Sequence, residues 1–81
     1  MTTDQIKAMS DEQINDAIAQ RNDYMFKPYS TDLSAACPLQ WGKDIPCNEP
    51  AFDNATMETD PRRCARLISE AWLYLKTKGE Q

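Results

Sequence analysis

The sequence has 81 residues, no histidine and only two glycines. Without histidine, the base that most often activates a serine or cysteine nucleophile is missing. Gly42 and Gly79 are too few to form a glycine-rich phosphate loop. Three cysteines without histidine do not provide the four paired ligands of a structural zinc site. A catalytic pair of carboxylates is still possible, but the spacing of the 13 acidic residues does not identify any two of them as that pair. We therefore expect no enzyme activity, no metal and no cofactor.

Long apolar runs are also missing, and none approaches the length that spans a membrane. The opening residues, Met1–Gln5, lack the basic and then apolar pattern of a secretory signal. The cysteines, Cys37, Cys47 and Cys64, are odd in number and widely spaced, which favours reduced thiols over a disulfide framework. These absences predict a cytoplasmic protein that does not bind membranes.

The charge balance is acidic, with 13 Asp and Glu against nine Lys and Arg and a formal net charge of −4. An acidic surface repels phosphate backbones, so direct nucleic-acid binding is not expected. It fits a protein partner with a basic surface, because opposite charges speed the encounter. The simpler alternative is that mild acidity only keeps a small protein soluble.

The length predicts one domain over residues 1–81 with a modest core. A domain of this size buries only about 60–65% of its unfolded surface. A bound partner or a homodimer contact would therefore add appreciably to its stability.

Near the N-terminus, capping residues predict where helices begin. Ser10 and Gln13 form a capping-box pattern, and apolar residues follow at helical spacing, which predicts an amphipathic helix over about 11–21. A shorter helical turn over 3–9 would be capped by Thr3.

The C-terminal helix has the clearest pattern. Asp60 is a typical N-cap, Pro61 suits the first helical position, and Gly79 lies just past the expected end. Trp72 borders the apolar stripe of this helix, and we expect Trp72 and Phe26 to pack inside. The stripe consists of Cys64, Leu67, Ile68, Ala71 and Leu75.

The middle of the chain suggests strands. The aromatic run Tyr24–Tyr29 predicts a short strand or extended segment. A brief helix should follow and end at Cys37, because Pro38 disfavours helical geometry in the residue before it. Residues 39–41 and 52–57 could each form a further strand. Together these elements predict an α+β fold, a small antiparallel sheet packed against N-terminal and C-terminal helices.

Three segments resemble small bacteriophage proteins of the phage ABA sandwich family. In chain order they are residues 10–15 (SDEQIN) followed by 17–19 (AIA), residues 28–36 (PYSTDLSAA) and residues 60–67 (DPRRCARL), which is also the family's order. Prolines interrupt the region where the family has a longer helix and a tryptophan-bearing hairpin. The resemblance implies a small mixed sheet with helices packed on it and a phage or prophage origin, and it implies no activity.

Together, size, acidity, missing catalytic groups and phage resemblance predict a non-enzymatic accessory protein. It would bind and inhibit a host protein in the host cell cytoplasm, and a defence inhibitor, including the anti-CRISPR class, is the most concrete version. Trp41 stands beside Gly42 in a proline-bounded segment, and an exposed tryptophan with an acidic rim is typical of a protein-binding hot spot. The predicted partner-binding residues are Trp41, Asp44, Glu49 and Asp53. The simpler alternative is that Trp41 covers the core.

A second functional class relies on the arginines near the start of the C-terminal helix. Arg62, Arg63 and Arg66 could bind an anion, since arginine matches carboxylates and phosphates in two-point contacts. This would make the chain a small-ligand or nucleotide-sequestering protein. The alternative is ordinary pairing with neighbouring acids, as between Arg66 and Glu70 four residues later. An oligomeric structural phage protein is a third possibility.

Overall fold

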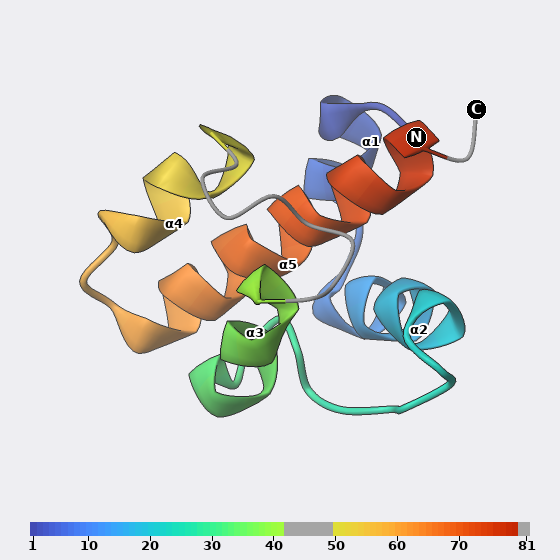
Figure 1. Cartoon of the computed structure of the whole chain (residues 1–81), viewed down its shortest axis with the longest axis horizontal. Helices are drawn as coiled ribbons and strands as arrows, with labels where there is room; N and C mark the ends of the chain where they lie inside the picture. Colours follow the sequence, from blue (N-terminus) through green and yellow to red (C-terminus); the bar gives the residue numbers. More distant parts are fainter. Residues whose placement is uncertain (42–49, 80–81) are drawn as a thin grey trace.

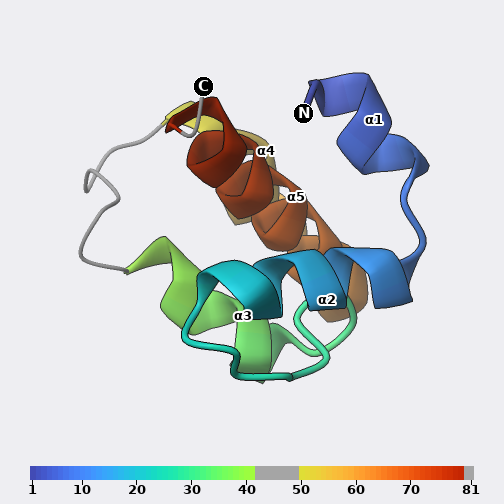
Figure 2. The same ribbon diagram turned by 90° about the vertical axis from the view of Figure 1, so that its right-hand side faces the viewer.

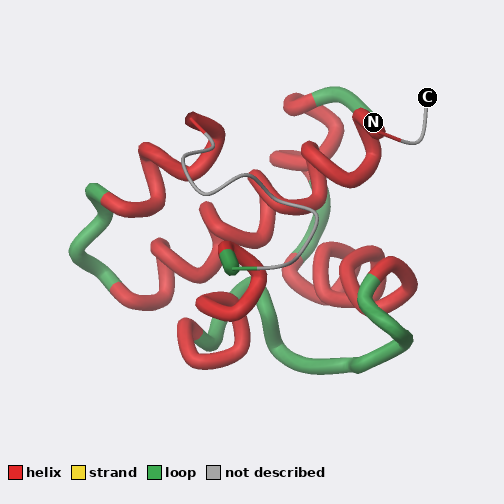
Figure 3. The backbone as a smooth tube through the Cα atoms, in the orientation of Figure 1, coloured by secondary structure: helices red, strands yellow, loops and turns green. Residues whose placement is uncertain are grey.

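The computed structural model describes residues 1–41 and 50–79, and every regular element in these residues is a helix (Figures 1 and 3). The elements are α1 (Thr3–Ala8), α2 (Asp11–Arg21), α3 (Leu33–Gln40), the 3-10 turn η1 (Pro50–Phe52), α4 (Asp53–Thr56) and α5 (Pro61–Gly79). The predicted α+β fold is therefore wrong, because the described part of the chain contains no strand and hence none of the expected sheet.

The capping prediction for α2 is confirmed. The Ser10 hydroxyl accepts a hydrogen bond from the Gln13 backbone N–H (3.2 Å), and the Gln13 side chain accepts one from the Ser10 N–H (2.9 Å). The first turn of α1 repeats this arrangement with Thr2 and Gln5, so its cap is Thr2 and not Thr3. Both capping boxes satisfy backbone donors that a helix start leaves free.

Helix α5 is the centre of the molecule. It begins at Pro61 as predicted, and the Asp60 carboxylate caps it by accepting from the Arg62 N–H (3.1 Å). In Figures 1 and 2, α5 runs diagonally through the structure, and α1, α2, α3, η1 and α4 all pack against it. The hydrophobic core therefore surrounds α5 and does not lie between two layers.

The buried face of α5 is broader than the predicted stripe and rotated from it. Ile68, within the stripe, and Trp72, beside it, are buried as expected. Leu67 and Leu75 are only half-buried, whereas Leu73, outside the stripe, is fully buried. Because several helices cover α5, its buried residues form one broad face at helical spacing: Ala65, Ile68, Ser69, Trp72, Leu73 and Thr77.

The segment between α2 and α3 is not the predicted strand. It consists of turns around a short irregular stretch, and only its last aromatic, Tyr29, enters the core. The Tyr29 carbonyl accepts a hydrogen bond from the Ser69 hydroxyl of α5 (2.8 Å), and the next N–H, of Ser30, donates to Asn15 of α2 (2.8 Å). Side chains from two helices thus form the hydrogen bonds with this backbone that a neighbouring strand would otherwise form. Phe26, expected inside, is 64% exposed, so that prediction is wrong.

Helix α3 continues past the proline that was expected to end it. Pro38 lies inside α3, which runs on to Gln40. A proline in this position removes the hydrogen bond to the Ser34 carbonyl. Ser34 and Pro38 are both exposed, so water can satisfy that carbonyl, while the opposite face of α3 buries Ala36 and Leu39 against the core.

The other two predicted strands are also helical. Residues 39 and 40 form the end of α3, with Trp41 as its C-cap. Residues 52–56 belong to η1 and α4, where Phe52 and Ala55 are buried in the core that surrounds α5. A single turn is enough to bury these two side chains, so no strand is required.

Candidate functional site

Trp41, the central residue of the predicted binding surface, is exposed as the sequence suggested. Its side chain is 74% exposed at the end of α3. Its backbone N–H donates to the Pro38 carbonyl (3.2 Å), which ties the residue to the last turn of the helix. Trp41 therefore does not cover the core; the C-terminal end of α3 presents it to solvent.

The predicted acidic rim of Trp41 can be placed only in part. Asp44 and Glu49 lie outside the described residues. Asp53 is exposed in the first turn of α4.

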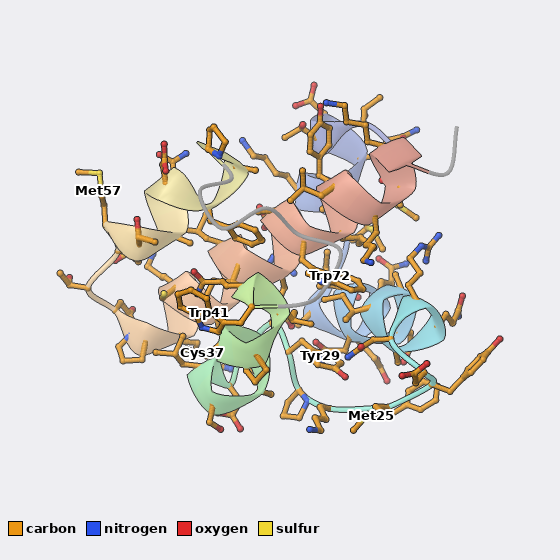
Figure 4. The ribbon with its side chains drawn as sticks, viewed as in Figure 1. Met25, Tyr29, Cys37, Trp41, Met57 and Trp72 are labelled. Carbon is orange, nitrogen blue, oxygen red and sulfur yellow. The ribbon has the colours of Figure 1, made fainter. Side chains whose placement is uncertain are left out.

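A second exposed apolar surface was not predicted as a site. Tyr24, Met25 and Phe26, called here the aromatic loop, are 72%, 46% and 64% exposed. Figure 4 places Met25 at the edge of the molecule, apart from Trp41 and from the exposed Met57 at the end of α4. Three consecutive large apolar side chains are thus directed to solvent at one place. The only sequence signal for this turn is Asn22-Asp23, a pair of residue types that tolerate turn geometry.

The aromatic loop is held in an unusual backbone conformation. Asp23 and Tyr24 both have φ of 56°, in the left-handed region. Aspartate adopts this region with little difficulty, but a bulky tyrosine rarely does, at a cost of about 1–2 kcal/mol. The Tyr29 hydroxyl donates to the Met25 carbonyl and accepts from the Asn22 side chain (3.2 Å). Buried Tyr29 thus holds the loop in the strained conformation that exposes its side chains.

The three arginines of the alternative anion site differ in their surroundings. Arg62 and Arg63 are exposed. Arg66 pairs with Glu70 (2.6 Å), as the spacing predicted, and with Asp11 (2.8 Å). Its guanidinium also donates to the Met9 carbonyl (2.6 Å) and the Lys7 carbonyl (3.4 Å). Arg66 therefore links the junction of α1 and α2 to α5 and is already occupied within the chain.

Two cysteines lie where α3 and α4 pack against α5. Cys37 and Cys64 are half-buried free thiols, and Cys47 lies outside the described residues. The Cys64 thiol donates to the Ala55 carbonyl (3.2 Å). Burial raises the pKa of Cys64, and negative charge on the neighbouring Cys37 (as thiolate) and Glu58 side chains raises it further. This environment favours the neutral thiol, the less reactive form.

Cys64 should therefore react slowly in the folded protein. In a Cys47→Ser variant, which keeps Cys37, we expect iodoacetamide to alkylate Cys64 several-fold more slowly at pH 8 than in the same variant unfolded in urea. Peptide mass spectrometry separates alkylation at Cys64 from alkylation at Cys37. In urea the pKa of the thiol is near its ordinary value of 9.0, whereas in the folded chain its pKa is higher. The favourable contribution of the neutral thiol to stability is thus complete below pH 9.0 and is lost as pH rises through the folded pKa.

The pH dependence separates this effect from simple shielding of the thiol. The alkylation rate should level off above pH 9.0 in urea and keep rising in the folded variant. Equal pH profiles in the two states would contradict the raised pKa.

Other kinds of site find little support in residues 1–41 and 50–79. No group of three Cys, Asp or Glu side chains there could hold a metal ion. A cavity of about 300 Å³ lies between α1, α4 and α5. It is lined mainly by apolar side chains such as Ile6, Leu67 and Ala71, with Lys7 and Glu70 also contributing. In the same ranges, no helix is both long and apolar enough to cross a membrane.

Comparison with known proteins adds no relative. No family model matches the chain, and no curated protein or solved structure matches it. The resemblance to phage ABA sandwich proteins therefore stays a prediction about origin, and the sheet it implied is not found in the described residues. The candidate surfaces are the single exposed side chain of Trp41 and the three exposed side chains of the aromatic loop.

Proposed function

We propose that this chain is a non-enzymatic protein that binds a host protein and inhibits it. The observation that carries the proposal is Trp41, 74% exposed on the C-cap of a helix. Tryptophan is enriched among the few residues that dominate binding energy at interfaces. Exposing so much apolar surface is unfavourable in a free protein and becomes favourable when a partner buries it.

Charge supports a partner with a basic surface. The chain has a net charge of −4, and carboxylates of α2 and α4, including Asp16 and Asp53, are exposed. Long-range attraction would speed the encounter with a positively charged surface, and that acceleration would weaken as salt rises.

The phage-like segments suggest the class of target. If the chain comes from a phage or prophage, a bacterial host protein is the natural partner, and a defence protein, such as a CRISPR effector, is the version we propose. The exposed aromatic surfaces are compatible with such a role because an inhibitor needs only a binding surface and no catalytic group.

The alternative function, sequestration of a nucleotide by arginines, has less support. Of the three arginines it requires, Arg66 already makes two ion pairs and two carbonyl contacts within the chain. Only Arg62 and Arg63 remain exposed for a ligand.

The test compares wild type with Trp41→Ala. Each protein is immobilised on a resin and incubated with bacterial lysate, and the captured protein is identified. The activity of the captured protein is then measured in the presence of wild type and of Trp41→Ala. We expect wild type to inhibit the captured protein and Trp41→Ala to bind it about thirtyfold more weakly, the equivalent of ~2 kcal/mol for a hot-spot tryptophan. Met57→Ala is the matched control, since Met57 is exposed but lies apart from Trp41 in Figure 4.

Two outcomes would contradict the proposal. One is a captured protein that Trp41→Ala binds as tightly as wild type or that wild type does not inhibit. The other is nucleotide binding by wild type that is lost when Arg62→Glu is combined with Arg63→Glu. That second result would favour sequestration.

A further inference from the structure

We propose that the aromatic loop and the acidic face of α2 form a contact surface for an apolar pocket rimmed by Lys and Arg on the partner protein. This proposal rests on the proposed function, because it specifies where and how the partner binds. The acidic face consists of Glu12 and Asp16 of α2 together with Asp23, which directly precedes the aromatic loop.

The aromatic loop is held by hydrogen bonds in a strained backbone conformation. Left-handed backbone at Tyr24 persists because Asn22 and buried Tyr29 fix the turn through hydrogen bonds. Strain of this kind is concentrated at functional sites in proteins. The loop therefore presents Tyr24 and Phe26 in a set conformation, which reduces the entropy lost when they enter a pocket.

Exposed carboxylates lie on α2 and in the turn that leads from α2 to the aromatic loop. Glu12 and Asp16 are four residues apart, so they are neighbours on one face of α2, and both are exposed. Asp23 is exposed in the turn that follows α2. Two basic residues flank the same segment: Arg21 is half-buried and donates to the Ala17 carbonyl of its own helix (3.0 Å), whereas Lys27, directly after Phe26, is exposed. The exposed charges on α2 and in this turn, Glu12, Asp16, Asp23 and Lys27, are thus three acids and one base.

These two features together define the partner's chemistry. Tyr24 and Phe26 project from the surface, so they require an apolar recess and not a flat or convex face. Asp23 directly before the loop, together with Glu12 and Asp16 on the preceding helix, favours cations around that recess. The same carboxylates disfavour an anionic lipid surface, which would repel them. They also disfavour a second copy of this face, which would bring like charges together.

The experiment uses the whole chain with Phe26 replaced by the photoreactive analogue p-benzoylphenylalanine. A matched probe carries the same group in place of Met57, which is exposed at the opposite edge of the view in Figure 4. Both are expressed in bacteria and irradiated, and cross-linked peptides are identified by mass spectrometry. We expect position 26 to cross-link to one host protein, within a recess lined by apolar residues and bordered by Lys and Arg.

Charge reversal then tests the electrostatic part. Combining Glu12→Lys with Asp16→Lys should reduce the yield of this cross-link at least fivefold. With the purified partner, combining Tyr24→Ser with Phe26→Ser should weaken binding at least tenfold. Trp41→Ser is assayed in parallel and should also weaken binding, because the proposed function requires Trp41 as a second contact with the same partner. A partner that needs Trp41 and cross-links at position 57 but not at position 26 would overturn this inference and leave the proposed function intact.

The other possible cross-linking results also support or overturn the proposed contact surface. Cross-links from position 26 to lipid, to a second copy of the chain or to an acidic surface would overturn the inference. A cross-link that charge reversal leaves unchanged would do the same. Cross-linking to a basic pocket on a protein that the chain does not inhibit would support the contact surface and contradict the inhibitory function.

Discussion

Replacing Arg66 with alanine is expected to lower the free energy of unfolding by about 2–4 kcal/mol. The guanidinium is largely enclosed, with 21% of the side chain exposed, and Glu70 beside it is 16% exposed. Removing the guanidinium leaves the Glu70 carboxylate and the Met9 carbonyl without their partner in a site that water reaches poorly. Urea denaturation followed by circular dichroism measures the change.

The matched control is Arg63→Ala, three residues earlier on the same helix. Arg63 is exposed, so its removal should change stability by no more than about 0.5 kcal/mol. A chain of this length has a total stability of roughly 4–12 kcal/mol, which makes the Arg66 effect a large share. Similar effects of the two substitutions would show that the link between α5 and the α1–α2 junction contributes little.

Leu73→Ala is expected to lower the free energy of unfolding by about 3–5 kcal/mol. Leu73 is completely buried, and removing its side chain leaves a cavity that surrounding helices cannot fill. Leu67→Ala removes the same atoms from the same helix. Because Leu67 is half-buried beside the cavity between α1, α4 and α5, it should cost only about 1–2 kcal/mol.

This pair also tests the orientation of α5. The sequence pattern placed Leu67 on the apolar stripe and left Leu73 off it, whereas the structure buries Leu73 more deeply. Urea denaturation of both variants gives the comparison. A larger loss for Leu67→Ala than for Leu73→Ala would mean that the helix faces the core as the sequence pattern suggested.

Helix starts were the part of the fold that the sequence determined well. Ser10 with Gln13 and Asp60 with Pro61 position the first turns of α2 and α5 through local hydrogen bonds and proline geometry. Such signals depend on residues a few positions apart. They can therefore be recognised without knowing what the helix packs against.

The predicted sheet failed because strand signals depend on context. Aromatic residues favour strands only where a neighbouring strand or core can receive them. Here, of the three aromatics in the run, Tyr29 is buried, and Tyr24 and Phe26 are exposed. Phe52 likewise enters the core from a single turn. The prediction that Pro38 would end its helix at Cys37 was also wrong, because the hydrogen bond that proline removes lies on the solvent side of α3.

The candidate site was predictable in part. The exposure of Trp41 followed from its position beside Gly42, and the pairing of Arg66 with Glu70 followed from helical spacing. The contacts of Arg66 with Asp11 and Met9 involve residues more than 50 positions away, which no local pattern indicates. The aromatic loop was missed because the exposure of Tyr24 and Phe26 depends on the turn that buried Tyr29 holds.

The central position of α5 has a consequence for biosynthesis. Within residues 1–41 and 50–79, every other helix docks on α5, yet α5 is the last of them to be translated. The other helices have at most 11 residues, too few to persist in isolation. The nascent chain should therefore stay unfolded on the ribosome until residues 61–79 have emerged, and then fold as one unit. Ribosomes stalled before and after this point would reveal the transition as protease resistance that appears only in the longer chain.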